Sequence, residues 1–159
     1  MIYAISIAGA HAIAADYADE PTEHIPPLQT TSTCTPENWR IFEIDTSTLE
    51  NVKNRDALLK LAHTYFCGTR IEDTRILQRH LPKRISSTWT DPETNKTGIN
   101  YISREDITPI GGSASNAHIR ERSNGIVISF ARHEGCLGSI YLRNIAGHWL
   151  ITDESINCC

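Results

Sequence analysis

The clearest pattern along the chain is an alternation of apolar and polar positions in its last third. Such alternation is typical of strands with one buried face. It predicts four strands, at 117–122, 126–133, 137–143 and 148–155. Asn124-Gly125 between the first two is a strong signal for a tight hairpin turn. The four segments therefore predict an antiparallel meander.

A helical repeat precedes the meander. Apolar residues recur at helical spacing between Leu49 and Phe66. Ser47 and Glu50 have the spacing of a capping box, so we expect this helix to begin at Ser47 and to end at Gly68. A second, shorter helix is predicted over 72–81, before Pro82.

The stretches around these helices carry weaker signals. Residues 83–98 are polar and rich in turn-forming types, which predicts a loop, and only 99–102 reads as a strand. Gly111-Gly112-Ser113 predicts another loop. Residues 39–44 alternate in part and predict a short strand or a docking segment.

The N-terminus differs in composition from the rest. Residues 1–15 are small and apolar, contain the A-x-A triplet Ala12–Ala14, and resemble the remnant of a signal peptide, although no basic residue precedes them. The alternative is a buried N-terminal segment of the fold. Residues 16–38 are rich in Pro and Thr and predict an extended or disordered lead. We expect 39–159 to form a single α+β domain.

The cysteines agree with export to the periplasm or outside the cell. There are five, dispersed, and no C-x-x-C pair suggests a metal or redox site. Dispersed cysteines in exported chains usually form structural disulfides. We expect at least one bridge between the helices and the sheet, with Cys67–Cys136 the favoured pair. Because five is odd, at least one thiol is free or joined to another chain.

The order of elements, and the ending Gly147-His148-Trp149-Leu150-Ile151, resemble the cystatin-like or nuclear-transport-factor-like fold over residues 47–157. The resemblance implies a cone in which a curled sheet wraps a long helix. It does not imply one activity, since some members are isomerases or hydratases and many only bind. Enzymes of this fold place a carboxylate or a His–Asp pair inside the cone. The candidates here are Asp106, His148, Asp153 and Glu154, and Asp153 follows the inward series Trp149 and Ile151.

Charge and hydropathy narrow the function classes. The net charge is −4, and residues 1–39 contain no Lys or Arg, which argues against a dedicated nucleic-acid binder. No apolar run approaches the roughly 20 residues of a membrane span. Gly111-Gly112-Ser113 lacks the spacing of a phosphate-binding loop. We expect no cofactor and no metal.

Two His and Cys pairs have spacings that permit chemistry. His63 and Cys67 lie four residues apart on the predicted helix, as metal ligands or a nucleophile pair would. His133 and Cys136 lie near one turn. Structural disulfides account for both cysteines, so we assign no catalytic residue.

Basic residues gather around the second helix. Such a group is usually a solvated face, and it can also meet an acidic partner. The members are Arg70, Arg75, Arg79, Lys83 and Arg84.

The leading hypothesis is a periplasmic binding protein, and most specifically an immunity protein or inhibitor that blocks a toxin or a cell-wall enzyme. Loops 88–98 and 109–116 would enter the partner's cleft. Trp89 is the expected anchor, with Arg84 and Arg104 supplying charge. The alternative is a small-molecule enzyme or ligand carrier that uses the cone interior. Enzymatic activity is the less favoured of the two.

Overall fold

The computed structural model describes residues 31–132 and 135–158. The helices are α1 (Pro36–Ser47), α2 (Arg55–Cys67) and α3 (Ile71–Arg79), with a short 3₁₀ helix at Arg104–Asp106. The strands are β1 (Arg84–Thr90), β2 (Thr97–Ser103), β3 (Ser115–Arg122), β4 (Gly125–Ala131), β5 (Cys136–Ile145) and β6 (His148–Cys158). The predicted signal peptide, most of the predicted lead and His133 lie outside the described residues.

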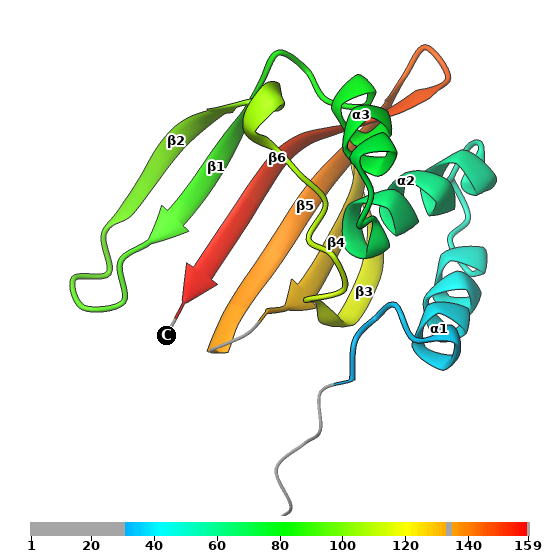
Figure 1. Ribbon diagram of the computed structural model, residues 1–159, viewed down its shortest axis with the longest axis horizontal. Coiled ribbons are helices and arrows are strands. Elements are labelled where there is room, and N and C mark those ends of the chain that lie inside the picture. The colour runs from blue at the N-terminus through cyan, green and yellow to red at the C-terminus, as the bar shows by residue number, and fades with distance from the viewer. Residues whose placement is uncertain (1–30, 133–134, 159) are drawn as a thin grey trace, which may run out of the picture.

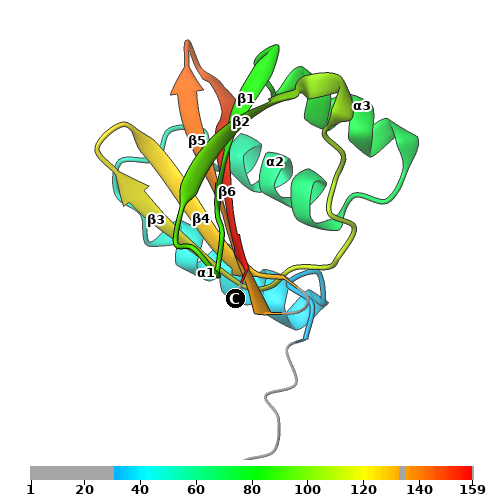
Figure 2. The ribbon, with the colours of Figure 1, turned by 90° about the vertical axis from the view of Figure 1, so that its left-hand side faces the viewer.

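The strands form one sheet in the order β2-β1-β6-β5-β4-β3. All neighbours are antiparallel except β1 and β6, which run parallel. The helices cover one face of the sheet, with α2 and α3 over its middle, and the β1–β2 hairpin extends beyond them (Figures 1 and 2). The predicted α+β arrangement, helices packed on a curled and mostly antiparallel sheet, is confirmed.

The predicted meander is also confirmed, as strands β3 to β6. The hairpin predicted between β3 and β4 is present, but it turns at Ser123-Asn124, and Gly125 is the first residue of β4, paired with Arg122. A side chain at Gly125 would collide with the Leu142 carbonyl of β5, so this turn requires glycine for the close approach of two backbones as well as for its shape.

The helix prediction is correct at one end and wrong at the other. α2 ends at Cys67, where the Gly68 amide donates to the Thr64 carbonyl over 3.1 Å. It begins at Arg55, and Ser47 is the last residue of α1. The Ser47 hydroxyl donates back to the Ile44 carbonyl at 2.6 Å and does not cap a new helix.

Residues 39–44 are helical, which corrects the prediction of a strand or docking segment. α1 begins at Pro36, inside the segment predicted as an extended lead, and the Thr35 hydroxyl caps it by accepting from the Asn38 amide at 3.3 Å. Thr before Pro is a strong helix-start signal. Phe42 and Thr46, one turn apart, are the buried residues of this helix.

The predicted loop at 83–98 is a strand hairpin. β1 lies between β2 and β6 and pairs with both, and the turn at Asp91–Lys96 joins β1 to β2. The side chains of β1 are mostly Ser and Thr, and Ile85 is the one buried residue of this strand. Pairing on both edges holds this strand in the sheet without an apolar face, so the hydrophobic pattern did not reveal it.

The core lies between the helices and the sheet. Phe66 of α2 contacts Phe42, Tyr65 and Phe130 edge to face, with a ring-centroid distance of 5.1 Å to Phe130. The apolar pattern predicts that Leu59 of α2 and seven further residues form most of the helix-to-sheet contact, and of these eight only Leu59 is partly exposed. The seven that are buried are Phe66, Ile128, Phe130, Ile140, Leu142, Trp149 and Ile151.

The disulfides differ from the predicted pair. Cys67 and Cys136 are both oxidised, but Cys67 is joined to Cys34 and Cys136 to Cys158. Cys34 precedes α1 and meets the end of α2, while Cys136 and Cys158 are directly opposed in the β5–β6 register. Among the described residues each bridge therefore stays within one layer, and none links the helices to the sheet.

Candidate functional site

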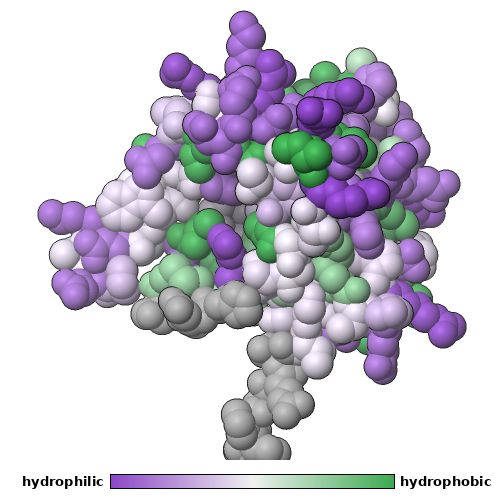
Figure 3. Space-filling view, in the orientation of Figure 1, coloured by the Kyte–Doolittle hydropathy of each residue, from purple (hydrophilic) through white to green (hydrophobic). Residues whose placement is uncertain are grey.

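A cavity of about 320 Å³ lies on the helix-covered side of the sheet, beneath the segment that follows β2. Figure 3 shows this side of the molecule, where hydrophobic and hydrophilic side chains lie close together. Helix α2, strands β2 and β6, the residue after β4 and the connecting segment contribute to the lining. It consists of Tyr65, Ile102, Arg132, Glu154, Ile156 and the segment 106–110.

A β-bulge at Thr152 determines which carboxylate enters the cavity. Ile151 pairs with Leu142 and Asp153 pairs with Tyr141, so Thr152 has no partner in β5. The extra residue inverts the alternation of inward and outward side chains along β6. Glu154 is therefore opposite the buried Ile140, on the cavity side.

The sequence-predicted carboxylates and His148 are thereby separated. Glu154 and Asp106 line the cavity. Asp153 lies on the opposite face of the sheet, where it accepts a hydrogen bond from the Ser86 hydroxyl, which corrects the expectation that it points into the cone. His148 is exposed at the start of β6.

The Glu154 carboxylate is held from β1. The Ser87 hydroxyl donates to Glu154 Oε1 at 3.0 Å. Within the described part of the chain, Oε2 has no hydrogen-bond partner, so it is available to accept from a bound molecule. A fixed carboxylate with a free oxygen is well suited to orient a ligand.

Tyr65 is the second polar group of the cavity. Burial raises the pKa of its hydroxyl, the nearby Glu154 carboxylate raises it further, and Arg132 acts in the opposite direction. The phenol therefore stays protonated at neutral pH and acts as a hydrogen-bond donor. Buried tyrosines usually donate to a partner, and among the described residues Tyr65 has none through its hydroxyl.

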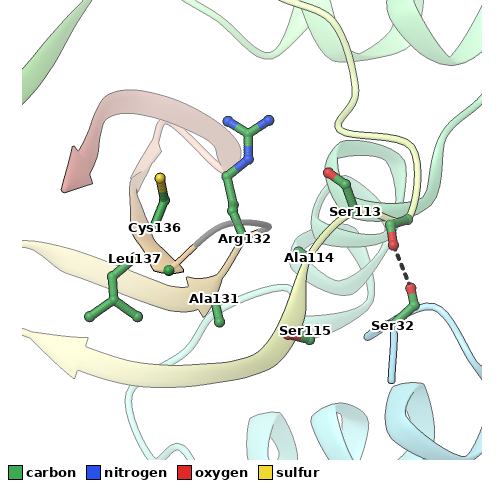
Figure 4. A pocket seen from close by; sticks show the side chains of 10 residues that line it. Ser32, Ser113, Ala114, Ser115, Ala131, Arg132, Cys136 and Leu137 are labelled. Atoms are coloured by element: carbon green, nitrogen blue, oxygen red, sulfur yellow. Dashed lines mark hydrogen bonds between the residues drawn. The ribbon is translucent and has the colours of Figure 1, made fainter. Parts of the chain in front are cut away.

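Arg132, the residue that follows β4, borders two hollows. One is the cavity with Glu154, and the other, of about 400 Å³, is lined mainly by small residues of the 112–115 segment together with Ser32 and Cys136. Figure 4 shows the Arg132 side chain extending away from Ser115, while the Ser32 hydroxyl donates to the Gly112 carbonyl at 2.7 Å. Among the described residues that line the cavity, only Arg132 is positively charged.

The His and Cys pairs do not form a site. Cys67 is in a disulfide, and His63 is exposed with its ring against Trp39, at a centroid distance of 4.7 Å. Cys136 is also in a disulfide. In residues 31–132 and 135–158, no group of three or more His, Cys, Asp or Glu side chains is placed to hold a metal.

The residues proposed to contact a protein partner are spread over two faces. Trp89 lies on β1, not in a loop, and faces the cavity side beside Ile156, with 40% of its surface exposed. Arg84 is exposed at the other end of β1, on the face opposite to the buried Ile85. Arg104 lies in the 3₁₀ helix and pairs with Glu105 at 3.2 Å.

The basic group around α3 is partly neutralised. Arg70 forms an ion pair with Asp73 at 3.3 Å, and Arg75 and Arg79 are exposed on α3. Hydrogen bonds from Arg70 hold the pKa of Asp73 below its usual value. This arrangement is that of a solvated helix face.

Comparison with known proteins identifies structural neighbours only. No family model matches the chain, and no curated protein is similar to it in sequence. An NTF2-like protein from Bacteroides fragilis has a TM-score of 0.45 and 11% identity over 68% of this chain, which spans about half (48%) of that protein. An NTF2-like protein of unknown function from Shewanella baltica has a TM-score of 0.46 and 16% identity, covering 69% of this chain and 96% of its own.

A third neighbour, from Silicibacter pomeroyi and also NTF2-like and of unknown function, has a TM-score of 0.42 and 14% identity, covering 64% of this chain and 92% of its own. These proteins belong to the nuclear-transport-factor-like group that the sequence resembles. The likeness concerns the fold alone.

Proposed function

We propose that this protein binds a small polar molecule in the cavity beside Glu154. The observation that carries the proposal is the bulge at Thr152, which places Glu154 on the same side of the sheet as Tyr65, where both line a cavity of about 320 Å³. Ligand sites are usually concave and mostly apolar, with a few polar groups that fix orientation. Ile102, Ile107, Ile110 and Ile156 supply apolar wall here, and Asp106 and Thr108 add further polar groups to the lining.

The polar groups have complementary roles. Tyr65 is a neutral donor, Glu154 an acceptor held by Ser87, and Arg132 a second donor with a positive charge. A ligand with a carbonyl and an N–H or O–H group would satisfy them together. A carboxylate in such a place can also act as a general base, so a bound substrate with an acidic C–H or O–H would make the same cavity an active site.

The test compares two neighbouring carboxylates. Glu154→Gln keeps the shape of the cavity but removes its negative charge, and Asp153→Asn makes the same change on the opposite face. A hydrogen bond to a charged group contributes about 1.5–3 kcal/mol, so we expect roughly 10-fold to 100-fold weaker retention of the native ligand in the Glu154 variant. Native mass spectrometry of protein from its own host measures this. Equal retention by both variants would exclude the cavity as the binding site.

A second proposal is the immunity protein or inhibitor favoured by the sequence. It is supported by the β1–β2 hairpin, which extends beyond the helices and exposes 40% of Trp89 (Figure 1). In this case Trp89→Ala should release a captured protein partner, and Glu154→Gln should not. Undiminished capture of the partner by the Trp89 variant would contradict this second proposal.

We also propose export to the periplasm or outside the cell. Two disulfides are typical of chains that fold in oxidising compartments. In the described residues, no helix is both long enough and apolar enough to cross a membrane. Fractionation of the native host tests the compartment.

A further inference from the structure

Two rows of side chains cross the open part of the sheet on the cavity side. The first row is polar and contains Asn100 of β2, Ser87 of β1 and Glu154 of β6, which are direct register partners. The second row, two residues further along β1, contains Gly98, Trp89 and Ile156. Side chains two apart along a strand share a face and lie about 7 Å apart. A polar strip therefore runs beside an apolar one.

Trp89 has a defined position in the second row. A Cβ atom at Gly98 would lie 2.6 Å from Cε2 and Cζ2 of the indole, so the ring rests directly on the Gly98 backbone. Gly98 does not have a positive φ, so its backbone would accept other residues, and the indole is what requires glycine there. The ring is thus fixed on one side by β2 while 40% of the residue stays exposed.

The geometry points to a sugar ring with an acetamido group as the ligand, a proposal that rests on the function proposed above. A pyranose has an apolar C–H face that stacks on an indole and polar edges that form hydrogen bonds. The row beside Trp89 offers such partners in Ser87, Asn100 and Glu154. An aromatic ligand stacked on the indole would need a second apolar wall on its other face. The register neighbours of Trp89 are Gly98 and Ile156, which lie beside the indole in the same sheet and do not form such a wall.

The acetamido group matches Glu154, the last member of the polar strip, and Tyr65 of α2, which lines the same cavity. Its carbonyl accepts from the protonated Tyr65 hydroxyl, and its N–H donates to Glu154 Oε2, which has no partner among the described residues. Both groups lie in the cavity, and Ile156 connects them to the Trp89 row. One ligand can therefore contact the indole and the cavity at once.

The experiment titrates the folded, oxidised protein with N-acetylglucosamine and follows amide shifts by NMR, with glucose and acetamide as probes that lack one half of the ligand. We expect N-acetylglucosamine to bind more tightly than either. Trp89→Ala should weaken binding about tenfold, as expected for loss of an aromatic stack. Gly98→Ala should also weaken it, because the indole is kept but displaced. Ile99→Ala, which changes the adjacent exposed residue on the other face, is the matched control and should bind like the wild type.

Two results would overturn the inference. If N-acetylglucosamine binds no better than acetamide, the sugar class is wrong. If it binds, and Glu154→Gln weakens it while Trp89→Ala and Gly98→Ala remain like the wild type, the cavity binds the ligand and the aromatic platform is not part of the site. In both cases the proposed cavity function is still judged separately, by retention of the native ligand in the Glu154 and Asp153 variants.

Discussion

At the scale of single residues, Thr152 has the largest consequence for the site. Because it is an unpaired extra residue in β6, it places Glu154 rather than Asp153 on the cavity side. The sequence identifies both acids as candidates, but strict alternation from Trp149 and Ile151 selects Asp153. A bulge depends on the pairing of two strands and has no residue signature here, so the sequence alone could not identify the inward carboxylate.

The raised pKa of Tyr65 predicts a loss of stability at alkaline pH. The folded protein holds the phenolic proton more tightly than the unfolded chain, whose tyrosine has the ordinary pKa of 10.0. The stability that this difference in pKa contributes is complete below pH 10. Above pH 10 the unfolded chain loses the proton first, and the free energy of unfolding falls by up to about 1.4 kcal/mol per pH unit. Tyr65→Phe should therefore flatten the fall in the free energy of unfolding. Urea titrations at pH values between 8 and 11, spaced roughly half a pH unit apart, measure how the free energy of unfolding changes with pH. Identical slopes for the variant and the wild type would contradict the burial of this hydroxyl.

At the scale of elements, the predictability of each segment follows its apolar pattern. Strands β3 to β6 bury alternate residues such as Ile128, Ile140 and Leu142, and the sequence predicts them well. β1 is stabilised by pairing on both edges and buries only Ile85, so it reads as a loop. The apolar pattern does not predict α1, because residues 39–44 alternate in part as a strand would. Thr35-Pro36 does carry the signal of a helix start.

The packing of α2 on the sheet predicts the effect of removing Phe66. Its side chain is fully buried and contacts rings from α1 and β4. Phe66→Ala should lower the free energy of unfolding by about 3–5 kcal/mol. The exposed Ile41→Ala on α1 is the control, with a change within about 0.5 kcal/mol. An unchanged denaturation midpoint for the Phe66 variant would show that α2 packs by another face.

At the scale of the whole molecule, the helices and the sheet are held together by their shared core, and each disulfide strengthens one layer. The sequence predicts the two layers and the involvement of Cys67 and Cys136, but not their partners, because the partners depend on where α1 docks and on the β5–β6 register. The cavity arises at this scale too, since α2, β2, β6 and the 106–110 segment meet there.

The bridges predict a defined peptide map. Digestion without reduction should yield a Cys34–Cys67 pair and a Cys136–Cys158 pair. Replacing Cys34 and Cys67 by serine should cost about 3–4 kcal/mol in the chain-entropy model while leaving the second bridge in place. Recovery of a Cys67–Cys136 peptide would contradict this arrangement.

An experimental structure of the protein purified from its native host would test the cavity proposal most directly. We expect a small molecule in the cavity, within hydrogen-bond distance of the Glu154 carboxylate and the Tyr65 hydroxyl. A structure in which Glu154 faces the opposite side of the sheet, or in which side chains fill the space between Tyr65 and Ile156, would contradict it.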